Sequence, residues 1–202
     1  MHDLKIYFAS SNEHKKQEMM RLLDGVVLTL PKEESISFDP VEDGNSFIEN
    51  ALIKAKDLYS KVKAPVIADD SGLVVDALDG RPGIHTSRYG DENGKKLLQI
   101  EKNAKLLDEM KGKTNRSARF VCALVLMLSN EQIYIIEEAV EGFISDSVRG
   151  EHGFGYDPLF LVENTNKSAA ELSDREKDSY SHRGRAARKM ALLIKALKED
   201  LK

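Results

Sequence analysis

The stretch Pro65-Val66-Ile67-Ala68-Asp69-Asp70-Ser71-Gly72 joins an apolar run to two adjacent carboxylates, a hydroxyl and a glycine. Residues 66–68 predict the end of a buried strand. Residues 69–72 predict a tight turn, because all four residue types favour turns. In α/β proteins, ligands bind at the carboxyl ends of the strands, so both aspartates are candidate functional groups. Taken alone, the stretch fits an ordinary turn as well as it fits an active site.

The N-terminal segment predicts a strand followed by a helix. Residues 4–9 form the predicted strand, and Ser10 and Glu13 have the spacing of a capping box at the start of the helix. Free N–H groups and the helix dipole favour an anion at such a start. Lys15 in the first turn is unfavourable for the dipole unless it faces an anion or solvent. The segment is therefore either an ordinary capped helix or a phosphate-binding turn.

A second helix is predicted from Ser46 onward, with Ser46 and Glu49 again at capping-box spacing. Asn50 and Lys54 lie along the border of its apolar face. Polar groups at such a border either snorkel to solvent or line a ligand site. Glu42 precedes the helix, where an acid can simply complement the dipole.

The C-terminal half predicts a long charged helix over 92–111 and a β-hairpin formed by 118–128 and 132–140. The apolar first strand of the hairpin is expected at the centre of the sheet. Residues 150–160 are rich in glycine and aromatic side chains, which suits either a planar ligand or a plain glycine turn.

A last helix is predicted from about Ala186 to Leu201, with His182 and Arg183 at its start and Lys177 nearby. Cations at the positive end of a helix are misplaced unless they meet an anion. This is the second cationic helix start in the chain, and the repetition favours a phosphate site.

Composition limits the function classes. The chain has 202 residues, 41% hydrophobic and 32% charged, a length that allows two small domains but favours a single globular domain over 1–202. A net charge of −4 argues against a nucleic-acid partner. The longest apolar run, 120–128, is too short for a membrane span. With one cysteine and no secretory signal expected, we predict a cytoplasmic protein. The scattered histidines disfavour zinc, so any metal is expected to be Mg²⁺ or Mn²⁺ held by carboxylates.

The chain closely resembles the inosine triphosphate pyrophosphatase family, whose members include the dITP/XTP pyrophosphatases. The match runs in the family's order over nearly the whole chain. The residues that carry it are Ser10-Ser11-Asn12-Glu13-His14-Lys15, Glu42-Asp43-Gly44-Asn45-Ser46-Phe47-Ile48-Glu49-Asn50-Ala51, Lys54-Ala55, Ile67-Ala68-Asp69-Asp70-Ser71-Gly72, Pro82-Gly83-Ile84, Arg88-Tyr89, Gly153-Phe154-Gly155-Tyr156-Asp157-Pro158-Leu159-Phe160, Ala169-Ala170-Glu171-Leu172 and Ser181-His182-Arg183-Gly184.

This resemblance implies an elongated, two-lobed α/β fold with a mixed central sheet flanked by helices and an active-site cleft between the lobes. It implies Mg²⁺-dependent hydrolysis of deaminated purine nucleoside triphosphates (ITP, dITP and XTP) to the monophosphate and pyrophosphate, with Mn²⁺ as a possible substitute. Such an enzyme cleanses the nucleotide pool and keeps these bases out of DNA and RNA. A homodimer is also implied.

The resemblance also assigns roles. Asp70 would accept the proton of the attacking water, with Asp69 in support, and Glu42 and Asp70 would bind the metal. Lys15 and Lys54 would supply positive charge to the phosphates. Phe154 would stack on the base. The implied substrate-binding residues are Ser10, Ser11, Asn12, Glu13, His14, Lys15, Lys54, Ser71, Phe154, Gly155, Tyr156, Asp157, Lys177, His182 and Arg183.

Two departures from the family pattern are Ser11, where glycine is frequent, and His85-Thr86, where Tyr-Ser is usual. Neither removes a charged group, so we expect tuned affinity. A Maf-type nucleotide pyrophosphatase is the nearest alternative, and residues 154–158 and 181–184 argue against it. An Asp-nucleophile phosphatase would carry its aspartates after the first strand. A nucleotide sensor without turnover would lack a catalytic carboxylate, whereas Glu42, Asp69 and Asp70 are all present.

Overall fold

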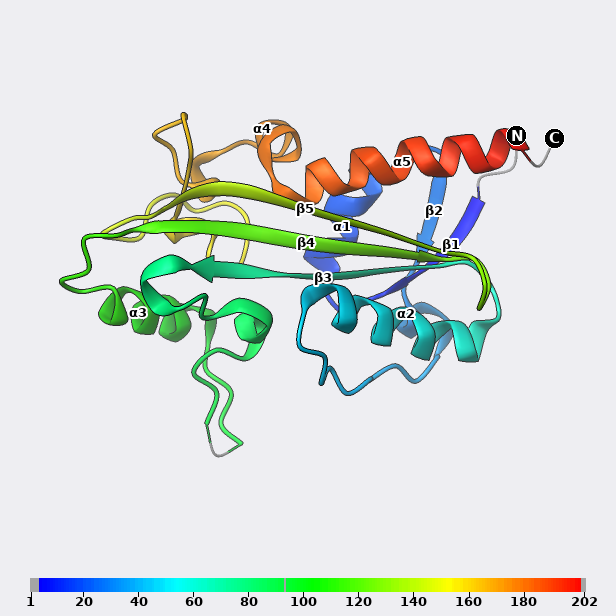
Figure 1. Cartoon of the computed structure of the whole chain (residues 1–202), viewed down its shortest axis with the longest axis horizontal. Coiled ribbons are helices and arrows are strands. Elements are labelled where there is room, and N and C mark those ends of the chain that lie inside the picture. Colours follow the sequence, from blue (N-terminus) through cyan, green and yellow to red (C-terminus); the bar gives the residue numbers. More distant parts are fainter. Residues whose placement is uncertain (1–3, 93, 201–202) are drawn as a thin grey trace. The chain divides into compact units, whose positions relative to one another are not determined.

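The computed structural model describes residues 4–92 and 94–200, and these residues form a six-stranded mixed sheet flanked by helices (Figure 1). The strand order is β2-β1-β3-β4-β5-β6. Strand β1 pairs in parallel with β2 and β3, and β5 pairs antiparallel with β6. The strands are β1 Leu4–Ala9, β2 Val26–Thr29, β3 Val66–Val75, β4 Ser117–Met127, β5 Ile133–Ile144 and β6 Phe160–Val162. The helices are α1 Glu13–Leu22, α2 Phe47–Val62, α3 Gln99–Glu109, α4 Asp174–Tyr180 and α5 His182–Asp200.

The predicted α/β class is confirmed, and so is the hairpin of β4 and β5. Strand β4 lies between β3 and β5, which confirms the central position expected from its apolar sequence. Strand β2 and helix α4 were not predicted. No helix in 4–92 or 94–200 combines the length and apolar character that crossing a bilayer requires.

The described chain divides into two compact units. Unit 1 contains residues 4–70, 122–138 and 182–200, and unit 2 contains 71–92, 94–121 and 139–181. Strands β3, β4 and β5 contribute residues to both units.

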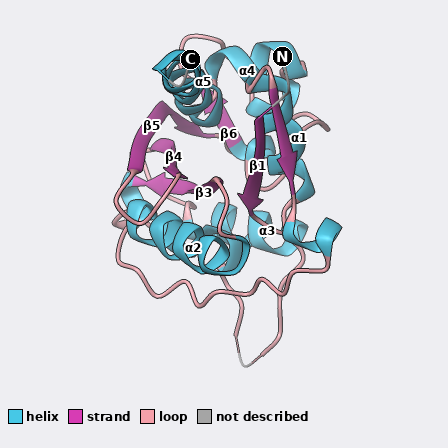
Figure 2. Ribbon diagram, turned by 90° about the vertical axis from the view of Figure 1, so that its right-hand side faces the viewer, coloured by secondary structure: helices cyan, strands magenta, loops and turns pink. Residues whose placement is uncertain are grey.

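The core of unit 1 packs α1 and α5 against one face of its strands. Met19 of α1 and Met190 of α5 join Ile6, Phe8 and Ile67 in one fully buried cluster. Helix α2 buries its own apolar face elsewhere, and Figures 1 and 2 show α2 and α5 on opposite sides of β3. Each such buried side chain contributes about 1.5–3 kcal/mol relative to an exposed one.

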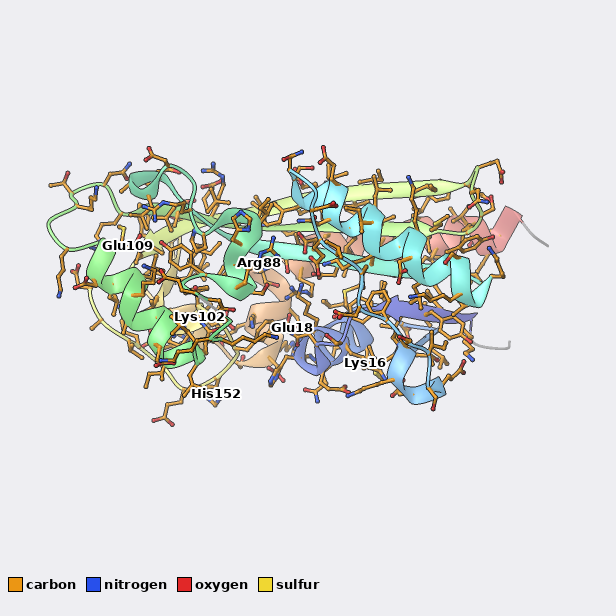
Figure 3. All side chains as sticks on the ribbon, turned by 90° about the horizontal axis from the view of Figure 1, so that it is seen from below. Lys16, Glu18, Arg88, Lys102, Glu109 and His152 are labelled. Carbon is orange, nitrogen blue, oxygen red and sulfur yellow. The ribbon has the colours of Figure 1, made fainter. Side chains whose placement is uncertain are left out.

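Unit 2 has a separate core, built around Leu73, Leu106, Phe120 and Phe160. The rings of Phe120 and Phe160 lie 4.6 Å apart in a tilted arrangement. Lys102 and Glu109 project from α3 in the side-chain view of Figure 3.

The turn predicted at 69–72 is wrong. Strand β3 runs without a break through these residues, from Val66 to Val75. The apolar pattern continues past the aspartates with Leu73 and Val75, both fully buried. Each aspartate meets cations on its own face of the strand, so an extended backbone can bury both carboxylates at tolerable cost.

Two helix boundaries also differ from the prediction. Helix α3 begins at Gln99, because Asp91 Oδ1 accepts a hydrogen bond from Leu97 N (2.9 Å) and holds the preceding segment as a loop. Ile100 is 73% exposed, and the buried residues of this segment are Lys102, Asn103, Leu106 and Met110. Helix α5 begins earlier than predicted, at His182. Its predicted end at Leu201, like Asn93 of the predicted 92–111 helix, lies outside the described residues.

Candidate active site

Asp69 is buried on the face of β3 that meets α1 and α5. It is 1% exposed, and its Oδ1 lies 2.5 Å from Lys15 Nζ. Arg183 Nε donates to its Oδ2 at 2.7 Å, and the Cys122 thiol donates to the same oxygen at 3.4 Å. Burial alone would raise the pKa of Asp69, but the charges of Arg183 and Lys15 outweigh it and hold the pKa well below its usual range. Asp69 is therefore a fixed negative charge.

Arg183 also binds a second carboxylate, which the sequence did not single out. Its Nη1 lies 2.6 Å from Glu18 Oε2 on α1, and both side chains are buried. The only hint of this in the sequence is that Glu18, an acid, directly precedes the buried residue Met19. The carboxylates of Asp69 and Glu18 thus lie beside the cations of Lys15 and Arg183. Removing one member of such a buried group leaves an uncompensated charge on its partner.

The turn between β1 and α1 is organised by Asn12. Its Oδ1 accepts from Lys15 N at 3.2 Å as the N-cap, and its own N–H donates to Ser10 Oγ at 3.1 Å. The predicted capping box of Ser10 with Glu13 is wrong, because Asn12 already occupies the cap. Ser11, Glu13 and His14 are exposed around this helix start. The turn can present amide N–H groups to an anion.

Asp70 lies on the opposite face of β3, toward α2. Lys54 Nζ lies 2.6 Å from Asp70 Oδ1 and 3.1 Å from Glu42 Oε2, and Lys54 is only 6% exposed. Ser46 caps α2 as predicted, its Oγ accepting from Glu49 N at 3.1 Å. Lys54 and Asn50 are buried on the helix face that meets this site, so neither snorkels to solvent.

The ionisation of this face differs from that of the Asp69 face. Burial raises the pKa of Asp70; Lys54 and Lys15 oppose that rise without cancelling it, and Glu42 adds to it. Burial lowers the pKa of Lys54, but the charges of Asp70 and Glu42 raise it by more. Lys54 therefore stays protonated between two carboxylates.

These residues fit a divalent cation. Asp70 Oδ2 is buried and has no hydrogen-bond partner within the described protein, so an acceptor is left for a ligand. No group of three or more His, Cys, Asp or Glu side chains suited to a metal occurs in 4–92 or 94–200. Mg²⁺ does not need one, because it is typically bound by one or two carboxylates together with substrate phosphates and waters.

Unit 2 brings together a different set of predicted residues. Lys177 Nζ lies 2.7 Å from Asp157 Oδ2 and 4.8 Å from the centre of the Phe154 ring. Phe154 N donates to the same Asp157 oxygen at 2.8 Å. A Cβ on Gly153 would meet that oxygen at 2.2 Å, so only glycine fits there. The loop around Phe154 is thus tied to a buried ion pair.

The remaining predicted residues are dispersed. Tyr156 is 1% exposed and belongs to the core of unit 2, where burial raises the pKa of its hydroxyl. The preceding residue, Gly155, has a positive φ of 65°. Ser71 is half-buried in the unit 2 part of β3, and His182 is buried at the start of α5 in unit 1.

The departure at His85-Thr86 has a local structural role. Thr86 Oγ1 accepts from Leu73 N at 2.9 Å and donates to Gly83 O at 2.6 Å, which ties the turn to β3. His85 Nδ1 accepts from Arg88 Nε at 3.1 Å.

Comparison with known proteins decides the family. The model of the Ham1 family matches residues 6–193, which is almost all of the sequence. The chain belongs to the Ham1 family. The match includes both faces of β3 and the Phe154 loop.

Three relatives of this Ham1 chain are similar to it over most of their length. A dITP/XTP pyrophosphatase of Treponema denticola is 50% identical over 192 residues, covering 95% of this chain and 99% of that protein. A dITP/XTP pyrophosphatase of Bacillus subtilis is 41% identical, covering 93% and 96%. The solved structure of a HAM1 protein from Coxiella burnetii is 36% identical, with a TM-score of 0.85 and coverage of 96% and 99%.

Proposed function

We propose that this protein hydrolyses the deaminated purine nucleoside triphosphates ITP, dITP and XTP to the monophosphate and pyrophosphate. The observation that carries the proposal is the pair Asp69–Asp70, whose carboxylates lie among buried cations on opposite faces of one strand. The names of the 40–50% identical relatives, all dITP/XTP pyrophosphatases, support the substrate class. In a cell this activity removes deaminated nucleotides before they enter DNA or RNA.

The metal is proposed to be Mg²⁺, with Mn²⁺ as a substitute, bound by Asp70 and Glu42. When bound there, Mg²⁺ would neutralise phosphate charge and ease deprotonation of the attacking water. Lys54 holds both carboxylates and adds a positive charge for the phosphates. Lys15, in the first turn of α1, supplies a second such charge next to amide N–H groups.

Asp70 is proposed as the general base that takes the proton of the attacking water. A base works best when its pKa lies near the operating pH, and the pKa of Asp70 is raised, whereas that of Asp69 is held down. Lys54 binds Oδ1 of Asp70, and Oδ2 has no hydrogen-bond partner within the described residues, so this carboxylate keeps acceptor capacity beyond its ion pair. Asp69 supports catalysis by fixing Lys15.

Base recognition is assigned to unit 2. Phe154 offers an aromatic face for stacking, and Lys177 and Asp157 set the position of its loop. A 6-oxo group accepts hydrogen bonds where adenine carries an amino donor, so a cationic donor of this unit such as Lys177 would select against ATP.

We further propose a cytoplasmic homodimer with no nucleic-acid or membrane partner. The family resemblance supports the dimer, and the net charge of −4 supports the lack of a polyanion partner. Light scattering at micromolar concentration tests the oligomeric state, and a monomer would contradict it.

A substrate panel tests the reaction. Purified protein with Mg²⁺ is given ITP, dITP, XTP, GTP and ATP, and pyrophosphate and orthophosphate are assayed separately. We expect pyrophosphate and monophosphate in equal amounts from the deaminated nucleotides, slow turnover of ATP, and no turnover in excess chelator. Orthophosphate as the first product, or ATP hydrolysed as fast as ITP, would overturn the proposal.

A further inference from the structure

Asn50 is a buried polar side chain that the catalytic scheme does not use. It lies on α2 one turn before Lys54 and is 0% exposed. Its Oδ1 accepts a hydrogen bond from Gly44 N at 2.9 Å, which fixes the orientation of the amide. Its Nδ2 is buried and has no partner within the described protein.

Gly44 is held against this helix start by close packing as well. A Cβ at Gly44 would lie 2.7 Å from Glu49 Cβ and 2.8 Å from Asn50 Oδ1, so no larger residue fits without displacing the loop. The next amide, Asn45 N, donates to Glu49 Oε2 at 2.7 Å. Two consecutive loop amides are thus bound by two consecutive side chains of α2.

The loop fixed in this way carries Glu42, two residues before Gly44. Glu42 reaches Lys54, and Lys54 reaches Asp70. Helix α2 therefore sets the position of Glu42 relative to Asp70 through Asn50 at one end and Lys54 at the other.

Stability alone does not account for Asn50. A buried amide NH₂ without a partner is unfavourable, and an apolar side chain of similar size would avoid that cost. Outer residues that orient metal ligands commonly determine metal affinity.

We propose that Asn50 is a positioning residue for the divalent-cation site: it clamps Gly44 so that Glu42 stays in place to bind the cation alongside Asp70. The inference rests on the cation site of the proposed function. It does not depend on which nucleotide is hydrolysed.

The test measures Mn²⁺ binding to the nucleotide-free protein by electron paramagnetic resonance, together with the thermal midpoint. Asn50→Leu preserves volume and removes the clamp. We expect its Mn²⁺ dissociation constant to rise by about 10- to 100-fold while the midpoint stays close to wild type. Gly44→Ala leaves residue 50 an asparagine but displaces the same loop, because the new Cβ would clash with Glu49 Cβ and Asn50 Oδ1, and it should weaken Mn²⁺ binding to a similar extent. The double variant should be no worse than either single variant, because both break one interaction.

Asn103→Leu is the matched control. Asn103 is also a buried helical asparagine, but its Nδ2 donates to Gly155 O at 3.3 Å in unit 2. Mn²⁺ affinity should not change in this variant. The inference is overturned if folded Asn50→Leu and Gly44→Ala bind Mn²⁺ within twofold of wild type, if Asn103→Leu shows the same loss, or if the wild type binds no Mn²⁺. The substrate panel is scored separately, so a wrong substrate class leaves this result intact.

Discussion

The two faces of β3 place adjacent aspartates in opposite electrostatic settings. Asp69 is bound by a lysine, an arginine and a thiol. Asp70 meets one lysine, which it shares with Glu42, and one of its oxygens has no hydrogen-bond partner within 4–92 and 94–200. A carboxylate with partners on both oxygens stabilises the neighbouring charges and the fold, whereas a carboxylate with one unpartnered oxygen can still accept a ligand or a proton. The difference predicts that one aspartate is needed for the fold and the other for turnover.

The largest expected effect is on turnover. Asp70→Asn keeps the size of the side chain and removes the base, so we expect kcat for ITP to fall by about 10²- to 10⁴-fold. Nucleotide binding, measured by calorimetry, should persist. The free energy of unfolding should fall less than in Asp69→Asn, because Lys54 keeps a second carboxylate partner, Glu42. Near-normal kcat would refute the assigned base.

Asp69→Asn should act mainly on stability. Removing the negative charge of Asp69 leaves Arg183 with one carboxylate partner, Glu18, and removes the ion pair of Lys15 with residue 69. Breaking a buried ion pair in this way costs about 3–5 kcal/mol. Urea unfolding followed by circular dichroism checks this, with Asp70→Asn as the control of equal size on the same strand. If both variants unfold at the same urea midpoint, the proposed contrast between the two faces fails.

The pH dependence of unfolding sharpens this contrast. The folded pKa of Asp69 is depressed, so its contribution is complete above the unfolded pKa of about 3.9 and is lost as pH falls toward the folded pKa. The stability gap between wild type and Asp69→Asn should therefore be constant from pH 7 to 5 and narrow below pH 4. A gap that already closes between pH 7 and 5 would contradict the depressed pKa.

The sequence could predict the residues of this site better than their arrangement. The position of Lys54 at the border of the apolar face of α2 followed from helical spacing, which left open whether the side chain snorkels to solvent or lines a site. The strand through 69–72 did not, because turn propensity is local, and the ion pairs that allow an extended chain come from residues far apart, such as Arg183. Glu18 was missed for the same reason: an acid on α1 shows no function until α5 brings an arginine to it. Tyr156 shared a motif with Phe154, and only packing placed its ring in the core.

The smallest expected effect comes from Cys122, and it tests how strongly Asp69 is held. Burial, and then the charge of Asp69, raise the pKa of this thiol well above its usual value, so it remains a protonated donor. A thiol is a weak donor, and two cations already bind the same carboxylate. Cys122→Ala should therefore cost only about 1 kcal/mol, mostly from lost packing, with kcat changed less than twofold. Cys122→Ser, which keeps a donor, is the control in the same urea titration. A loss as large as that of Asp69→Asn would mean that the thiol, rather than Arg183 and Lys15, fixes Asp69.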